Sequence, residues 1–355
     1  MDNSLNIGQM FVVGFSGCEV GSDHWIVSAI QRDQLGGVIL FDRNVDTSVQ
    51  NIRSPRQLRQ LINTLRQYAE MPMFIAVDQE GGKVCRLKER DGFSTSSSAA
   101  VLAKEGISAT RREAQAMATM LADQGVNLNF APVVDLDLNP ENPIIGRYQR
   151  SFGADPGEVA GHALAFIEAH HRHAVGCCLK HFPGHGSAGG DSHLGFVDST
   201  DCWQRIELEP YRRLIDAGYS DGIMTAHLVH RGLDPLGLPA TLSPAMVTGI
   251  LRQELGFAGV IFSDDLQMRA ISKGWSYAEA VQRAVLAGVD VLIVGNNLDP
   301  RQDAVRVGIA AIRDLLDRGG IDENCIRDSL ARITLFKAKI TGRQTWKDLG
   351  PPTAW

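Results

Sequence analysis

The chain has 355 residues, with 41 acidic against 35 basic side chains and a formal net charge of −6. Its content of 44% apolar and 21% charged residues is typical of a globular protein and excludes a disordered or fibrous one. Because Lys and Arg are not concentrated in blocks, we expect neither a nucleic acid nor a membrane surface as a partner.

The first residues, Met1-Asp-Asn-Ser-Leu, lack the basic start and apolar stretch of a signal peptide. No apolar run approaches the roughly 18 residues of a membrane helix, so a cytoplasmic protein is expected. The cysteines form no CxxC pair, which favours free thiols over disulfides or zinc ligands. They are Cys18, Cys85, Cys177, Cys178, Cys202 and Cys325.

Eight short apolar runs recur along the chain between helical patterns. They are too apolar to alternate in polarity and too short for helices, which is typical of strands buried on both faces of a parallel sheet. The sequence therefore predicts eight strands. They lie in residues 11–15, 37–41, 74–78, 128–135, 176–181, 222–227, 260–264 and 289–295.

Helix start signals stand between several of these strands. Ser54-Pro55, Asp155-Pro156 and Ser243-Pro244 each precede apolar residues spaced three and four apart. The Ser or Asp side chain can accept backbone N–H groups of the first turn, and Pro at the next position needs no N–H. Further helices are predicted over 277–287, ending at Gly288, and over 321–340.

Eight strand and helix alternations favour an α/β fold of the (β/α)8 TIM-barrel type over an open, doubly wound sheet. Neither GxGxxG nor GxxxxGK[ST] occurs, so the usual nucleotide-binding signatures of the open sheet are missing from the sequence. No linker divides the chain, which predicts a single catalytic domain over 1–355 with a C-terminal helix and a short tail. Residues 81–127 and 139–155 are expected to form long loops at the barrel mouth.

Polar residues end most of the predicted strands, at the place where barrels of this type carry their active sites. A single polar strand end could be a solvent-facing cap, but six that converge on one mouth indicate a functional site. These residues include Asp78, Glu80, Asp135, His181, His227, Asp264, Asp265, Asn296 and Asn297.

The densest segment is 180–193, which holds His181, His185, Asp191 and His193 among four glycines. Such a loop could bring an acid or base onto a bound substrate, and Asp191 could orient the imidazole of His193. A metal site on the three histidines is a weaker alternative, because Pro183 and the glycines break helical ligand spacing. Phosphate binding by the glycines is weaker still, since no Lys-Ser/Thr follows them.

The doublet Asp264-Asp265 ends the seventh strand. Adjacent strand residues point to opposite sides, so one aspartate is expected to face the barrel axis and the other to cap the next helix. Asp264 is the candidate for the mouth. The aromatic residues Phe182, Trp203 and Tyr148 lie near these segments, and packing in the core is the expected role of each.

These segments resemble the family 3 glycoside hydrolases, and among them the bacterial β-N-acetylhexosaminidases of peptidoglycan recycling. The resemblance rests on residues 8–15, 36–41, 77–82, 129–135, 150–152, 180–186 and 261–266, with Lys-His-Phe-Pro-Gly-His-Gly and a downstream Asp-Ser-His as its most specific part. It implies a barrel with Asp264 as nucleophile and His193 as acid/base, assisted by Asp191. It also implies sugar contacts by Asp78, Arg86, Arg150, Lys180 and His181.

The chain departs from the family in the segment Ile145-Gly-Arg-Tyr-Gln-Arg-Ser-Phe152. Three residues separate Gly146 from Arg150 where the family usually has one, so Arg147 competes with Arg150 for the sugar contact. The catalytic loop also differs from that of the recycling enzymes around residues 186–191 and 195–200.

The resemblance implies a retaining exo-β-N-acetylglucosaminidase that acts through a covalent glycosyl-aspartate, with muropeptides as candidate substrates. A carbohydrate is then the partner, and neither a cofactor nor a metal ion is expected. The alternatives are a phosphorylase or a β-glucosidase on the same scaffold, a non-catalytic sugar-binding barrel, and a metal-dependent hydrolase. The oligomeric state is left open.

Overall fold

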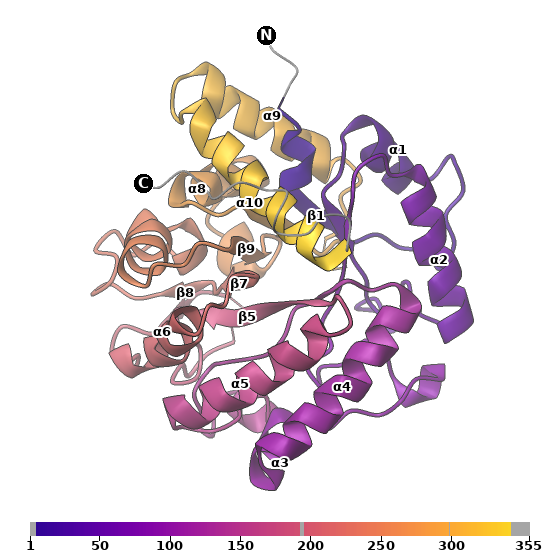
Figure 1. The fold of residues 1–355 in the computed structure, drawn as a ribbon. Coiled ribbons are helices and arrows are strands. Elements are labelled where there is room, and N and C mark those ends of the chain that lie inside the picture. Colours follow the sequence, from indigo (N-terminus) through magenta and orange to yellow (C-terminus); the bar gives the residue numbers. More distant parts are fainter. Residues whose placement is uncertain (1–4, 192–194, 298, 342–355) are drawn as a thin grey trace.

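In the computed structural model, which describes residues 5–191, 195–297 and 299–341, eight parallel strands close into a barrel (Figure 1). Each strand pairs with the next along the chain, and the last pairs with the first. The predicted (β/α)8 fold is confirmed. The barrel strands are β1 (Phe11–Val13), β2 (Gly37–Ile39), β3 (Phe74–Val77), β4 (Leu128–Asn129), β5 (Gly176–Phe182), β7 (Gly222–Thr225), β9 (Val260–Asp265) and β10 (Val291–Val294).

Every predicted apolar run contains one of these strands, but β4 is much shorter than the predicted 128–135. Beyond Asn129 the chain continues through Pro132, which has no N–H to donate to a neighbouring strand. A single bridge between Val133 and Lys180 resumes the pairing with β5. The run is nevertheless buried throughout, which is why its composition resembles that of a long strand.

Helices surround the barrel in Figure 1. The predicted caps are present: Ser54 Oγ accepts the Gln57 N–H at 3.3 Å, and Asp155 Oδ1 accepts the Gly157 N–H at 2.7 Å. The helices are α1 (Trp25–Arg32), α2 (Pro55–Tyr68), α3 (Ala99–Glu105), α4 (Ile107–Gln124), α5 (Pro156–His171), α6 (Glu209–Asp216), α7 (Arg269–Ser272), α8 (Tyr277–Ala287), α9 (Ala304–Asp317) and α10 (Glu323–Thr341). The π-helical segment η6 (Ala245–Glu254) follows Ser243-Pro244, and the 3₁₀ turns are η1 (Ile7–Met10), η2 (Glu89–Asp91), η3 (Gly146–Tyr148), η4 (Arg205–Leu208) and η5 (Ala240–Leu242).

The prediction of a long loop over 81–127 is wrong for most of that range, because α3 and α4 occupy it. Neither helix has a side chain that caps its first turn, so the start signal used elsewhere is missing here. Residues 139–155 do form a loop, with η3 inside it. The structure also adds a small parallel pair outside the barrel, β6 (Val197–Asp198) with β8 (Leu228–Val229).

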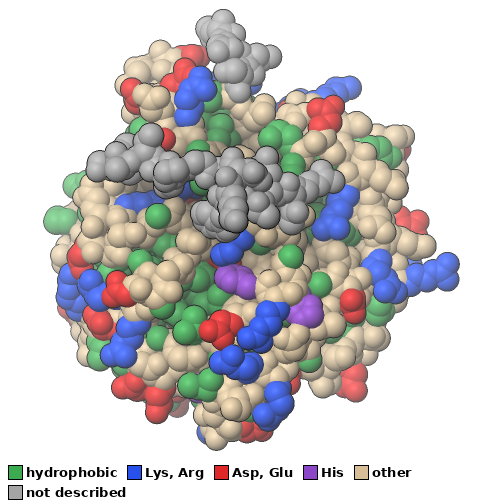
Figure 2. Space-filling model, in the orientation of Figure 1, with side chains coloured by type: hydrophobic (Ala, Val, Ile, Leu, Met, Phe, Trp, Pro, Cys, Tyr) green, Lys and Arg blue, Asp and Glu red, His purple; other side chains and the backbone are tan. Residues whose placement is uncertain are grey.

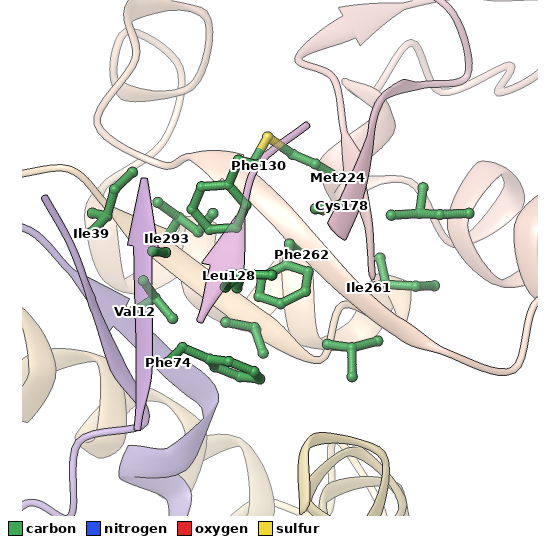
Figure 3. Packing of buried hydrophobic residues seen from close by; sticks show 14 of the residues in the cluster. Val12, Ile39, Phe74, Leu128, Phe130, Cys178, Met224, Ile261, Phe262 and Ile293 are labelled. Atoms are coloured by element: carbon green, nitrogen blue, oxygen red, sulfur yellow. The ribbon is translucent and has the colours of Figure 1, made fainter. Parts of the chain in front are cut away.

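Aromatic and aliphatic side chains fill the barrel interior (Figure 3). Phe262 lies edge-on to Phe74 and Phe130, with ring centroids 5.8 and 5.6 Å apart. Phe336 of α10 packs against Phe74 at 5.5 Å, so α10 closes the end of the barrel opposite to the polar strand ends. The barrel interior is therefore filled at this end.

Buried carboxylates fasten α10 to the barrel. Asp290 accepts hydrogen bonds from Ser329 and Arg332 of that helix at 2.7 and 2.9 Å. Over the face drawn in Figure 2, charged side chains of both signs are scattered among apolar ones. None of the helices described is long and apolar enough to cross a membrane. All six cysteines are free thiols, as predicted, and Cys85, Cys177 and Cys178 are buried.

Candidate active site

A pocket of about 430 Å³ opens at the carboxyl ends of the barrel strands. Residues from the ends of β2, β3, β5, β7, β9 and β10 line it, as the positions of the polar strand ends predict. It brings together every candidate site residue except His193, which lies outside the described residues. The candidates in its wall are Asp78, Arg86, Arg150, Lys180, His181, Asp191 and Asp264.

Asp78 follows β3 and lies between two cations. Lys180 Nζ, from β5, is 2.8 Å from Asp78 Oδ1, and Arg86 Nη2 is 3.1 Å from Oδ2. Burial opposes ionisation of this carboxyl, but the charges of Lys180 and Arg86 outweigh it and hold its pKa well below the usual range. Asp78 is thus a fixed anionic acceptor, which suits the hydroxyl groups of a sugar.

Glu80, two residues further on, was named as a polar strand end but was assigned no role from the sequence. Arg150 binds it with two parallel hydrogen bonds, Nε to Oε2 and Nη2 to Oε1, both of 2.7 Å. Lys180 Nζ approaches the same Oε1 at 2.7 Å, so this lysine bridges Glu80 and Asp78. Although burial opposes its ionisation, the two cations lower the pKa of Glu80 to about 2. Its place at the end of the third strand was the signal in the sequence.

The structure places Arg150, and not Arg147, in the wall of the pocket. Arg150 is 9% exposed in its side chain and lies in the pocket wall. Arg147 is 60% exposed and pairs with Glu141 at 2.7 Å on the surface. The extra residues in the loop therefore lengthen the turn before Arg150 rather than moving the arginine that reaches the pocket.

His181 is oriented by Asp135, the residue that ends the fourth apolar run. Its Nδ1 lies 2.7 Å from Asp135 Oδ2, and Arg150 Nη2 lies 3.3 Å from its Nε2. A guanidinium can only donate, so Nε2 is the acceptor and Nδ1 carries the proton shared with Asp135. Burial by itself would raise the pKa of Asp135. The neighbouring imidazole of His181 outweighs this effect, so the pKa of Asp135 is lowered from its usual value.

Both aspartates of the doublet at the end of β9 line the pocket, which corrects the prediction that only one would. The pairing of β9 with β10 shifts between Val291 and Ile293, and such an irregularity breaks strict alternation. Asp265 Oδ1 accepts the N–H groups of Gln267 and Gly295, both at 3.0 Å. It therefore fixes the turn before α7 and the end of β10, instead of capping the helix itself.

Asp264 has a different environment. Its Oδ1 accepts the N–H of the following residue at 2.8 Å, and the side chain is half-buried in the pocket wall. Asp264 Oδ1 thus accepts the N–H of its own neighbour, whereas Asp265 Oδ1 joins the N–H groups of two separate segments. This difference supports the choice of Asp264 made from the sequence.

Two further groups complete the wall. Tyr148, expected in the core, is partly exposed at the pocket, and Lys83 Nζ lies 3.6 Å above its ring. Apolar side chains supply the rest, among them Ile39, Phe41, Phe130, Met224 and Met268. By contrast, Phe182 is fully buried and Trp203 packs against the core, as predicted.

The described residues contain no group of three or more His, Cys, Asp or Glu side chains placed to hold a metal ion. His181 and His185 have ring centroids 6.0 Å apart, and His181 is engaged with Asp135 and Arg150. What the pocket offers is a set of fixed carboxylates and cations around a closed end. This arrangement suits a polar, hydroxyl-rich ligand at the mouth of a barrel.

Comparison with known proteins identifies the family. The model for the glycosyl hydrolase family 3 N terminal domain matches residues 4–336, and the chain belongs to this family. A β-hexosaminidase of Tolumonas auensis is 39% identical over 304 residues, 84% of either chain. One from Xanthomonas oryzae pv. oryzae is 34% identical over 330 residues, covering 88% of this chain and 92% of the relative. The glycoside hydrolase expected from the sequence is thereby confirmed.

Solved structures agree with the fold. A family 3 β-N-acetylglucosaminidase from Paenibacillus sp. superposes with a TM-score of 0.86 at 32% identity, covering 100% of this chain and 65% of the other. A β-N-acetylhexosaminidase from Beutenbergia cavernae superposes with a TM-score of 0.83 at 28% identity, over 95% and 99% of the two chains.

Proposed function

We propose that the protein is a retaining exo-β-N-acetylglucosaminidase that removes a terminal, β-linked N-acetylglucosamine. The observation that carries this proposal is the convergence of Asp78, Lys180, Arg150 and Asp264 on one pocket with a closed end. Asp78 and the cations can bind the hydroxyl and acetamido groups of one terminal sugar. Asp264 lies in the same wall and supplies a carboxylate for the reaction at its anomeric carbon.

The chemistry follows from a carboxylate and a proton donor on opposite sides of the glycosidic bond. Asp264 attacks the anomeric carbon, while an imidazole protonates the departing oxygen, and a glycosyl–Asp264 ester forms. The imidazole then takes a proton from water, which attacks the ester and restores the original configuration. We assign this acid and base role to His193, which lies outside the described residues, with Asp191 as its partner.

A single domain over 1–355 would supply this acid/base from its own loop, and Asp191 in the pocket wall supports that arrangement. The cytoplasmic location expected from the N-terminal sequence stays a prediction.

For the other half of the substrate we propose fragments of peptidoglycan. A groove of about 370 Å³ adjoins the pocket, and the two share Lys83 and Tyr148. Tyr148 offers an aromatic face to a second sugar ring. The ammonium group of Lys83 has no carboxylate partner among the residues that the structure describes, so it is available to an anionic group. A muropeptide carries both features, a second sugar and carboxylates.

Product analysis tests the reaction. An aryl β-N-acetylglucosaminide should yield free N-acetylglucosamine, initially as the β-anomer, at a rate that added phosphate does not change. An aryl β-glucoside should be turned over far more slowly. Formation of the sugar 1-phosphate in phosphate buffer would instead indicate a phosphorylase, and faster turnover of the glucoside would indicate a β-glucosidase.

The variant Lys83→Gln tests the second half of the substrate. It should lower kcat/KM for a disaccharide muropeptide relative to that for the neutral disaccharide N,N′-diacetylchitobiose, by up to about fivefold, because a partly exposed ion pair contributes up to ~1 kcal/mol. Lys104→Gln, an exposed lysine of α3, is the matched control and should leave this ratio unchanged. An equal ratio in Lys83→Gln and the wild type would exclude an anionic contact at Lys83.

A further inference from the structure

A buried glutamate that the reaction does not use lies beneath the segment between β5 and Asp191. Glu207, in η4, is 1% exposed. Its Oε2 accepts the N–H groups of Gly186 and Ser187 at 3.0 and 3.4 Å, and its Oε1 accepts the hydroxyl of Ser187 at 2.5 Å. One carboxylate therefore holds two consecutive residues of this segment, by main chain and side chain together.

Two glycines make this approach possible. A Cβ on Gly184 would lie 2.5 Å from the Cβ of Glu207, and this glycine has a φ of +122°. A Cβ on Gly186 would lie 1.6 Å from the carbonyl oxygen of Leu136. The glycines of this loop therefore allow close packing against Glu207 and against Leu136, which follows β4, as well as a backbone conformation that other residues rarely adopt.

Other groups hold the opposite side of the same segment. Asn142 Nδ2 donates to the carbonyl oxygens of His185 and Ala188 at 2.7 and 2.9 Å. Asp135 Oδ1 accepts the N–H of His185 at 2.8 Å. The segment is clamped between these side chains and Glu207, and three residues beyond Ala188 the chain places Asp191 in the pocket wall.

We propose that Glu207 is a positioning residue that holds residues 184–188 so that Asp191, and the acid/base group it orients, face the bound sugar. This inference rests on the proposed function for what Asp191 does, and on the hydrogen bonds of Glu207 alone for what Glu207 holds. Glu207 touches neither the pocket nor a substrate, since it does not line the cavity. Its effect is transmitted through the backbone of Gly186 and Ser187.

The clamp is also sensitive to pH. Burial raises the pKa of Glu207 to about 7, against the hydrogen bond from Ser187, and the Asp135 carboxylate raises it further. Among the described residues, the titratable groups that face Glu207 are Asp135 and the buried phenol Tyr211 of α6. The ionised carboxylate accepts all of its donors, whereas protonation weakens it as an acceptor. The clamp is therefore strongest above about pH 7.

The variant Glu207→Gln tests the proposal, because its amide resembles the protonated carboxyl in shape. The amide oxygen can accept the backbone N–H groups while the NH2 donates to Ser187. We expect kcat to fall about 10- to 100-fold, since small misplacements remote from the reacting atoms have effects of this size. Inhibition by N-acetylglucosamine should change by less than about twofold, because Asp78, Lys180 and Arg150 bind it. The wild-type kcat should rise with pH near 7 as Glu207 ionises, and this rise should be absent from Glu207→Gln.

Two controls separate positioning from folding. Glu209→Gln, two residues away on α6 and partly exposed, should leave kcat and its pH profile unchanged. The melting temperature of Glu207→Gln at pH 8 should not fall. Because the pKa of Glu207 is raised in the native state, keeping the carboxyl ionised above that pKa costs folding free energy. The neutral side chain of Gln removes this cost. Loss of kcat together with an equal loss of N-acetylglucosamine binding would overturn the proposal.

Hydrogen exchange of residues 183–191 distinguishes failure of this inference from failure of the proposed function. If the wild-type protein turns over no β-N-acetylglucosaminide, the function is wrong, and exchange then decides on the clamp alone. Faster exchange in Glu207→Gln than in the wild type supports the clamp. Unchanged exchange, or unchanged kcat in an active enzyme, overturns it.

Discussion

Replacing Asp264 with alanine should lower the turnover of an aryl β-N-acetylglucosaminide by about four orders of magnitude or more, the range seen when a covalent nucleophile is removed. The loss is expected because the two carboxylates considered as substitutes are engaged by other groups. Asp265 is held by the N–H groups of Gln267 and Gly295, and Asp78 by Lys180 and Arg86. Initial rates, with the melting temperature as a check on folding, measure the effect.

Asp265→Asn is the matched control within the doublet. Asparagine keeps the Oδ1 that accepts the two N–H groups, so this variant should retain far more activity than Asp264→Ala. If Asp265→Asn were inactive and Asp264→Ala active, the nucleophile would be the second aspartate.

The missing nucleophile can be replaced from solution. Alanine at position 264 leaves room for a small anion such as azide, which would attack the anomeric carbon from the side of the lost carboxylate. The product should be the α-glycosyl azide, opposite in configuration to the substrate, identified by nuclear magnetic resonance. Restored turnover without this product would argue against a covalent glycosyl–Asp264 intermediate.

The barrel was predictable because its signals are local. Each strand is a short apolar run, and helices such as α2 and α5 begin at a Ser-Pro or Asp-Pro pair that caps them. The helices missed, α3 and α4, begin without a side-chain cap, and α4 starts directly after Gly106, which ends α3. α4 packs against α5 and α2, and α3 packs against α4, and a scan for start signals does not detect such contacts.

The site was predictable only in part, because its geometry depends on contacts between distant segments. The choice of Asp264 followed from its strand end, since all strand ends meet at one end of a barrel, whereas the sugar contacts of Asp78 and Lys180 were implied by the family resemblance. Glu80 also follows a strand end, but the spacing of residues does not show that it pairs with Arg150, 70 residues away along the chain. The positions of Asp265 and Tyr148 depend on a shift in strand pairing and on the extended loop before Arg150, and neither is visible in the spacing of residues.

Replacing Glu80 with glutamine should have the second large effect, on stability as well as on activity. Glu80 is 5% exposed in its side chain and lies between Arg150 and Lys180. Its replacement would leave Lys180 with Asp78 alone and would remove the carboxylate that binds Arg150. Breaking a buried ion pair from one side costs about 3–5 kcal/mol of the free energy of unfolding. Denaturant unfolding at pH 7 measures it. Activity should fall too, because Glu80 fixes the side chains of Arg150 and Lys180.

The pH dependence of this difference identifies its cause. The pKa of Glu80 is lowered from 4.5 to about 2 in the native state, so its stabilisation is fully present above about pH 5 and is lost as the pH falls toward 2. The gap between the wild type and Glu80→Gln should therefore narrow over that interval. Glu141→Gln breaks the exposed pair with Arg147 and should cost far less at every pH, because both partners are largely solvated. Equal losses in the two variants, or a gap that stays constant down to pH 2, would mean that Glu80 does not hold the cationic wall of the pocket through its charge.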